Sequence, residues 1–191
     1  RTFMYKQKTE TQLEASIIKE QSAASSAFQK ALNELVVQDE KLKQISIKQK
    51  ESTQLNYSDQ QMLQQFIEHQ KSQDKLLAKI NQTMERNLKD FKKDGKDVFN
   101  DQLQKRLRSQ QDELKKNEKI LEEIEKVISK INKEDLAKKI HEMAKQSKNK
   151  QQSLKQLLEL TKRYYITKKL ERINSKLKEL SEAQEQLADK G

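Results

Sequence analysis

The stretch LRSQQDELKKNEKILEEIEKVISKI (107–131) carries the clearest helical repeat in the sequence. Eight positions along it are spaced alternately by three and four residues; six of these are apolar, and Gln110 and Asn117 fill the other two. A seven-residue apolar repeat lines one face of a helix and buries that face against a neighbouring helix. We therefore predict a coiled-coil seam made of Leu107, Leu114, Leu121, Ile124, Ile128 and Ile131.

The overall composition extends this prediction to the whole chain. The 191 residues include no proline and no cysteine, and the only glycines are Gly95 and Gly191. Proline and glycine interrupt helices, so a chain without them is free to form very long ones. Ile, Leu, Val and Phe account for only 44 residues, which is too few for a wide globular core. We predict an all-α fold of elongated helical hairpins, a coiled-coil bundle of four or five long helices.

Breaks in the apolar spacing divide the chain into these helices. Ser58 and Gln61 have the spacing of a helix-initiating capping box, Gly95 suits a helix C-cap, and the polar stretch QSKNKQQS (146–153) is a candidate hinge. Short breaks favour antiparallel hairpins, and the alternative is one bent rod built from two or more chains. We expect residues 1–191 to be a single elongated segment of a larger protein, with helices at 11–50, 59–93, 97–131, 134–146 and 153–189.

The residue types that carry catalysis or bind metals are sparse. His69 and His141, the two histidines, are far apart in sequence, and neither belongs to a His pair or Glu-x-x-His motif of the kind that binds metals. Two glycines cannot build a phosphate-binding loop, and almost every carboxylate has a lysine three or four residues away, which is typical of helix-surface pairing. We therefore expect no enzyme activity, no cofactor, no metal site and no small-molecule substrate.

Positive charge is concentrated in one segment. Residues 138–178 carry 13 basic and 3 acidic side chains, whereas residues 179–191 carry 1 basic and 4 acidic ones. Lysines spaced by seven residues wind slowly around a helix as one stripe. This stripe is a candidate contact for an anionic partner, and it consists of Lys148, Lys155, Lys162, Lys169 and Lys176.

Two adjacent tyrosines lie inside this basic segment, in KRYYITKK (162–169). Tyr164 and Tyr165 follow Leu157 and Leu158 by seven residues, so we predict that both rings pack on or beside the apolar face. Rings that are packed in this way are poor platforms for stacking nucleic-acid bases. We expect the lysines to be solvated, and the alternative is that residues 145–178 bind nucleic acid or an anionic membrane surface.

The C-terminal part of the chain, LLELTKRYYITKKLERINSKLKELSEAQEQLADK (157–190), keeps the apolar alternation of three and four to its end. It resembles a family of large, uncharacterised bacterial membrane proteins, which have transmembrane segments near the N-terminus followed by a long coiled-coil-rich region. The resemblance implies a membrane-associated protein of the bacterial cell envelope whose anchor lies outside this stretch. It implies no catalytic residue.

These observations together predict a non-enzymatic structural or protein–protein interaction module. We expect its partner to be another protein or a second copy of the chain. Nucleic acid or anionic lipid, bound through residues 145–178, is the alternative partner.

Overall fold

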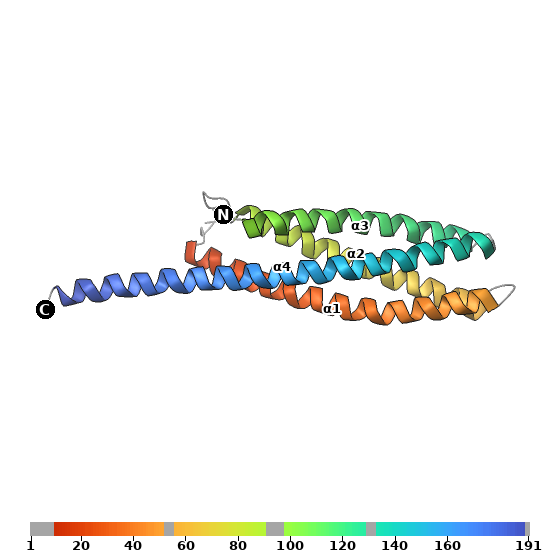
Figure 1. Ribbon diagram of the computed structural model, residues 1–191, viewed down its shortest axis with the longest axis horizontal. Coiled ribbons are helices and arrows are strands. Elements are labelled where there is room, and N and C mark those ends of the chain that lie inside the picture. Colours follow the sequence, from red (N-terminus) through yellow and green to blue (C-terminus); the bar gives the residue numbers. More distant parts are fainter. Residues whose placement is uncertain (1–9, 52–55, 91–97, 129–132, 190–191) are drawn as a thin grey trace, which may run out of the picture.

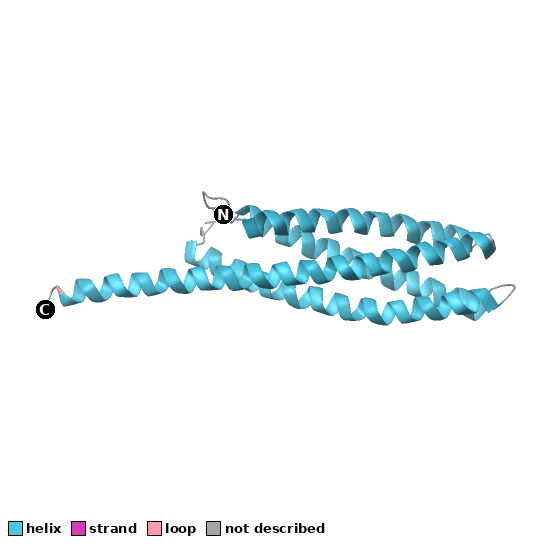
Figure 2. Ribbon diagram, in the orientation of Figure 1, coloured by secondary structure: helices cyan, strands magenta, loops and turns pink. Residues whose placement is uncertain are grey.

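The computed structural model describes residues 10–51, 56–90, 98–128 and 133–189. Within these ranges the chain forms α-helices and no β-strand, which confirms the all-α prediction (Figure 2). The number of helices in the described residues is four. They are α1 (Glu10–Glu51), α2 (Tyr57–Asp90), α3 (Val98–Ile128) and α4 (Lys133–Ala188).

The four helices run antiparallel to their neighbours in sequence and form an elongated assembly (Figure 1). Lys48 near the end of α1 pairs with Asp59 near the start of α2, whereas Asn87 near the end of α2 bonds Glu20 near the start of α1. Helix α1 packs against α2 and α4, and α3 packs against the same two helices. Helices α2 and α4 therefore lie diagonally opposite each other across the centre of the assembly.

Two separate clusters of buried apolar side chains hold the helices together, and every helix contributes to both clusters. The first cluster includes Phe28, Leu77, Leu107 and Leu157, and it occupies the half nearer the start of α1. The second cluster includes Leu42, Ile67, Leu121 and Ile140, and it occupies the other half. Long helices with few apolar residues thus bury two narrow cores instead of one wide one.

The predicted seam of the third helix falls in these clusters. Leu107, Leu114, Leu121 and Ile124 are buried, and the two polar seam residues, Gln110 and Asn117, are buried with them. Ile128, at the end of α3, is half-buried against the second cluster, and Ile131 lies outside the described residues.

The predicted hinge at residues 146–153 is wrong. These residues lie inside α4, so the helices expected at 134–146 and 153–189 are one helix of 56 residues. The polar side chains of the stretch have partners on other helices: Ser147 and Gln151 donate to Asp39 of α1, and Lys150 pairs with Asp74 of α2. The polar sequence thus marks a place where α4 makes polar contacts, and the helix continues through it.

The start of α2 also differs from the prediction. The helix begins at Tyr57, and the side-chain Oδ1 of Asn56 accepts a hydrogen bond of 2.8 Å from the backbone amide of Asp59. Asn56 is therefore the N-cap, because an asparagine oxygen satisfies one of the amides that the first turn leaves unpaired. Ser58, the predicted cap, lies within the first turn. Gly95, the predicted C-cap, lies outside the described residues.

The burial of the α3 seam leads to a stability prediction. We expect Leu121→Ala to lower the free energy of unfolding by about 2–5 kcal/mol, because the Leu121 side chain is fully enclosed and truncation leaves a cavity. Leu76→Ala is the matched control, since Leu76 in α2 is half exposed, and it should change stability by less than about 0.5 kcal/mol. Equal shifts of the two variants in urea denaturation would contradict this core.

Candidate functional site

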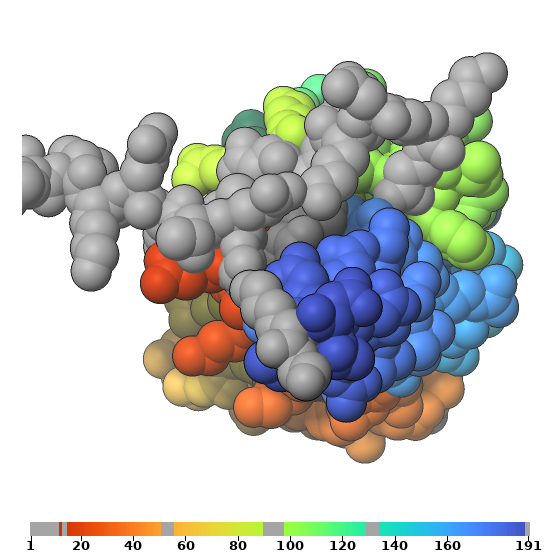
Figure 3. Space-filling view, turned by 90° about the vertical axis from the view of Figure 1, so that its left-hand side faces the viewer, coloured from red at the N-terminus to blue at the C-terminus, as the bar shows by residue number. Residues whose placement is uncertain are grey.

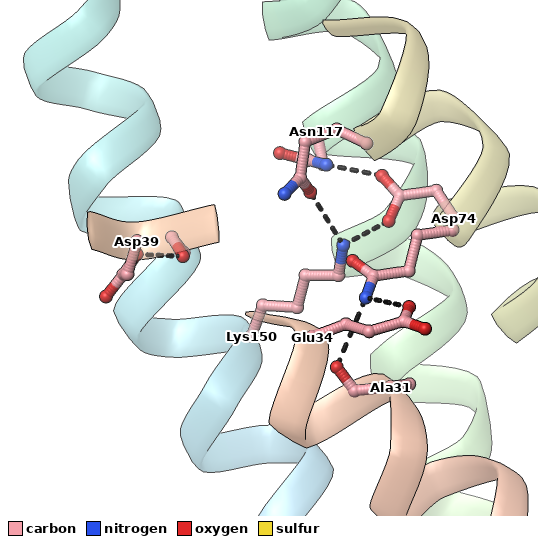
Figure 4. A network of polar contacts seen from close by, with 9 residues as sticks. Ala31, Glu34, Asp39, Asp74, Asn117 and Lys150 are labelled. Carbon is pink, nitrogen blue, oxygen red and sulfur yellow. Dashed lines mark hydrogen bonds and ion pairs between the residues drawn. The ribbon is translucent and has the colours of Figure 1, made fainter. Parts of the chain in front are cut away.

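A layer of polar side chains, most of them buried, lies between the two apolar clusters. Figure 4 shows the contacts within this layer. At its centre the ammonium group of Lys150 in α4 pairs with Oδ1 of Asp74 in α2, and the Nδ2 of Asn117 in α3 donates to the other oxygen, Oδ2. Lys150 also donates to Oε1 of Gln70 at 3.4 Å. Lys150 is only 4% exposed and Asp74 only 8%, so this ion pair is enclosed by the helices.

Helix α1 joins the polar layer through two further contacts. The Nε2 of Gln73 in α2 donates to the backbone oxygen of Ala31 and to Glu34, each at 3.2 Å. Asp39 of α1 accepts from Ser147 and from Gln151 of α4, the latter at 2.9 Å. All four helices are therefore connected by side-chain hydrogen bonds at one level of the assembly. We call Asp39, Gln70, Gln73, Asp74, Asn117 and Lys150 the polar layer.

The polar layer is arranged for structure rather than for proton transfer. Both carboxylate oxygens of Asp74 are already occupied, one by the Lys150 ammonium and the other by the Asn117 amide. A general base needs a free oxygen within reach of a substrate proton. A buried ion pair with additional hydrogen bonds instead restricts how the helices align, because any slip separates the charges in a medium of low dielectric constant.

An open groove between α3 and α4 is lined by four cationic side chains. Lys105 and Arg106 contribute from α3, and Lys155 and Arg163 contribute from α4; its cavity volume is about 800 Å³. One carboxylate, Glu159, also lines the groove and pairs with Arg163 at 3.1 Å. The groove is therefore a cationic surface that Lys155, one of the five predicted lysines, helps to form.

Polar contacts between α3 and α4 extend well beyond the polar layer. The carboxyl group of Glu113 in α3 has a pKa above its usual range, mainly because it is partly buried, and a hydrogen bond with Ser153 of α4 and the nearby charge of Lys116 offset this only in part. On the same pair of helices, Lys139 of α4 binds Glu123 of α3, and this contact lowers the pKa of the Glu123 carboxyl group. The two helices thus face each other through charged as well as apolar side chains.

The five predicted lysines are all exposed, as expected for a solvated stripe: Lys148, Lys155, Lys162, Lys169 and Lys176. Tyr164 is 1% exposed and packs in the first apolar cluster, and Tyr165 beside it is half-buried. The Lys169 ammonium lies 6.0 Å from the centre of the Tyr165 ring. The Tyr164 ring is therefore part of the packing and presents no open face for stacking.

The last part of α4 projects beyond the other helices (Figures 1 and 3). Every side chain from Ile173 to Asp189 is exposed, and we call this segment the α4 tail. Apolar side chains nevertheless continue along it at spacings of four, three and seven residues. Together with two residues just before the tail they form a stripe in which each side chain is between 47% and 72% exposed: Ile166, Leu170, Ile173, Leu177, Leu180 and Leu187.

The sequence predicts the alternation of these apolar residues but not their exposure. It does not predict the polar layer, because the partners of Lys150 lie on α2 and the hydrogen bond that completes the site comes from α3, far away in sequence. The only available signal is the polar stretch around Lys150, which suggests a hinge. His69 and His141 are both exposed, and the part of the chain that the structure describes contains no cluster of His, Cys, Asp and Glu suited to a metal ion.

Across the four described helices, no segment is both long and apolar enough to cross a lipid bilayer. Comparison with protein-family models, with curated proteins and with solved structures found no match to this chain.

The enclosed ion pair leads to a second prediction. We expect Lys150→Met to lower the free energy of unfolding by about 3–5 kcal/mol, because it leaves the buried Asp74 carboxylate without its counter-charge. The triple variant Lys150→Met, Asp74→Leu, Asn117→Leu should recover this loss, since a well-packed apolar layer is often as stable as a buried ion pair. Chemical denaturation of the parent protein and the two variants measures both effects.

A Lys150→Met variant as stable as the parent protein would show that Asp74 reaches solvent. Lys155→Met is the control, because Lys155 lies about one and a half turns further along the same helix and is exposed. It should leave stability unchanged to within about 0.5 kcal/mol.

Proposed function

We propose that this chain is a non-enzymatic structural and protein–protein interaction module of a larger protein. In this proposal, helices α1, α2 and α3 and the first part of α4 form a coiled-coil bundle that acts as a rigid support, and the exposed stripe on the last part of α4 is the interaction surface. The observation that carries the proposal is the exposed apolar stripe from Ile166 to Leu187, whose side chains have coiled-coil spacing and are each about half exposed or more.

Such an apolar stripe has an unfavourable free energy when it is left in water. Each fully buried leucine or isoleucine side chain contributes roughly 1.5–3 kcal/mol relative to an exposed one. Single exposed apolar residues are common, but a continuous stripe of them at heptad spacing is typical of a helix that binds another helix. A protein partner or a second copy of the chain would remove this surface from water.

The support is well suited to hold such a surface. Leu157, Thr161 and Tyr164 are buried in the first apolar cluster or beside it, so α4 is firmly packed up to the point where the stripe begins. An amphipathic helix that is already formed loses less conformational entropy on binding than a disordered segment does. The resemblance of residues 157–190 to coiled-coil regions of bacterial membrane proteins supports an envelope-associated parent protein with its membrane anchor outside this chain.

The proposal predicts that the stripe contributes nothing to the stability of the bundle. We expect the double variant Leu170→Gln, Leu177→Gln to change the free energy of unfolding by less than about 0.5 kcal/mol per site at low protein concentration, because both side chains are 60% exposed. Thermal and urea unfolding of the full chain measure this. A loss of several kcal/mol in dilute solution would show that the stripe belongs to the core of the bundle, which excludes it as a binding surface.

The cationic groove between α3 and α4 favours a second candidate function, the binding of nucleic acid or an anionic membrane surface through residues 145–178. Four cationic side chains line the groove, Lys155 among them, and the other four exposed lysines of the stripe extend its positive charge along α4. Phosphate-rich partners bind such surfaces through counterion release, and therefore bind less tightly as salt increases. The buried Tyr164 ring argues against base stacking as part of this binding.

Titration of the purified chain against single-stranded DNA, duplex DNA and anionic vesicles tests this second candidate. If it is correct, Lys155→Gln, Lys162→Gln, Lys169→Gln should weaken binding and reduce the salt dependence, by up to about one unit of slope for each phosphate that is no longer neutralised. The control removes three exposed lysines of α1, as Lys19→Gln, Lys30→Gln, Lys41→Gln. An equal reduction of affinity in the control would indicate nonspecific attraction to the net charge, and no binding by the parent chain at low salt would reject this function.

A further inference from the structure

The exposed stripe lies on the opposite face of α4 from the side chains that pack into the bundle. The packed side chains include Leu157, Thr161 and Tyr164, and the same spacing places Lys168 next, whose side chain is 12% exposed. The stripe begins two residues after Tyr164, at Ile166, and continues at Leu170. Each residue advances about 100° around a helix, so a shift of two residues turns the apolar face by about 200°.

This reversal of the apolar face excludes a simple extension of the bundle along the tail. Suppose that another helix covered the face of α4 that continues from Leu157, Thr161 and Tyr164. The buried positions after Lys168 would then be Glu171, Ser175, Lys178 and Glu182, which are polar and exposed. Whatever covers the stripe must therefore approach α4 from the side that faces away from the bundle.

The charges of the α4 tail and of the five residues before it indicate what approaches this part of the helix. Residues 168–178 carry five basic and one acidic side chains, a net charge of +4. Residues 179–189 carry four acidic side chains and no basic one, a net charge of −4. The two halves have equal length and opposite charge, so this part of α4 is complementary to its own reverse. A helix with this pattern attracts an antiparallel copy of itself and repels a parallel copy.

We propose that residues 168–189, which are the α4 tail and the five residues before it, bind the same residues of a second copy of this chain as an antiparallel two-helix coiled coil. The two-fold axis lies between residues 178 and 179, where the sign of the charge changes. Leu170 then packs opposite Leu187 of the other copy, Ile173 opposite Gln184, and Leu177 opposite Leu180. The basic half of each tail lies beside the acidic half of the other, and the two bundles project from opposite ends of the dimer.

The proposal rests on the function proposed above, and it names a second copy as the partner. Its first test is the mass of the full chain in solution, measured by light scattering at protein concentrations from about 1 µM to about 1 mM, which covers dissociation constants in that range. We expect a concentration-dependent rise from the 22.6 kDa of one chain to twice that mass. The variant Leu170→Gln, Leu177→Gln should remain monomeric throughout and should stay folded.

A monomeric parent chain at every concentration would overturn the proposed dimer. That result would leave the interaction module itself standing if the same Gln variant kept full stability, since the stripe would then await a different protein. A large drop in the stability of the Gln variant would instead overturn the interaction module. A mass above two chains would also reject the antiparallel pair.

Cysteine crosslinking determines the orientation, because the chain has no cysteine of its own. One variant carries Ile173→Cys and the other carries Gln184→Cys with a tag that changes its size. In the antiparallel dimer these two positions lie opposite each other, so the mixed sample should form the mixed disulfide and little of either homodisulfide. A parallel pair would produce the two homodisulfides, and this outcome would overturn the proposed orientation.

Charge reversal tests the origin of the orientation. The variant Glu179→Lys, Glu182→Lys, Glu185→Lys makes the second half of the tail basic, so each basic half meets a basic half in an antiparallel dimer. We expect self-association to weaken by about tenfold or more at low salt, with a smaller effect once the Debye length falls to about 8 Å. In a parallel dimer the second halves repel each other before and after the change, so an unchanged affinity would refute antiparallel pairing.

Discussion

The pairing of Lys150 with Asp74 is the constraint on which the alignment of the four helices depends. Transfer of either charge from water into the core costs several kcal/mol, and this cost is offset only when the two charges meet and their remaining hydrogen-bonding groups are satisfied. Asp74 and Lys150 lie on α2 and α4, which are diagonally opposite each other, and Asn117 of α3 donates a hydrogen bond to Asp74. Leucine and isoleucine pack in many alignments, whereas this ion pair forms in one.

The polar layer also opposes alternative alignments of the helices. A heptad repeat is degenerate, since a shift of one helix by seven residues returns similar side chains to similar positions. A shift of that size in α4 would bring Met143 or Leu157 to the level that Lys150 occupies, depending on its direction, and would leave Asp74 facing an apolar side chain. The cost of a buried unpaired carboxylate therefore disfavours the shifted alignments that the apolar residues alone would allow.

Much of the fold could be predicted from the sequence because it depends on local properties. The scarcity of glycine and proline predicts long helices, and the spacing of Leu107, Leu114 and Leu121 identifies the buried face of α3. The continuity of α4 could not be predicted in this way, since Lys150 looks solvated until Asp74 is placed beside it. Asn56 is hard to identify as the cap because serine at position 58 offers the same chemistry two residues later.

The α4 tail shows a further limit of prediction from sequence, and it also shows a sequence signal that marks its exposed apolar face. Alternation of three and four continues through Leu170, Ile173 and Leu177, and it is easily interpreted as one continuous apolar face of the last helix. The step of two residues between Tyr164 and Ile166 breaks that face, because positions on opposite sides of a helix differ by about two residues. The apolar spacing along a helix therefore has to be followed residue by residue. A step of two residues marks where the apolar side chains move from the face that packs on the other helices to the face that is available to bind a partner.

A single helix that carries both faces has a physical advantage for the proposed dimer. A segment as short as the tail is only marginally helical alone, because forming the first turn is unfavourable. In α4 that turn is already formed, since Leu157 and Tyr164 are buried in the first cluster and the helix only has to continue past them. Pairs such as Lys178 and Glu182, four residues apart, add slightly to this continuation. The packed helices thus reduce the conformational entropy that the tail gives up on binding, which is a large part of the cost of joining two short helices.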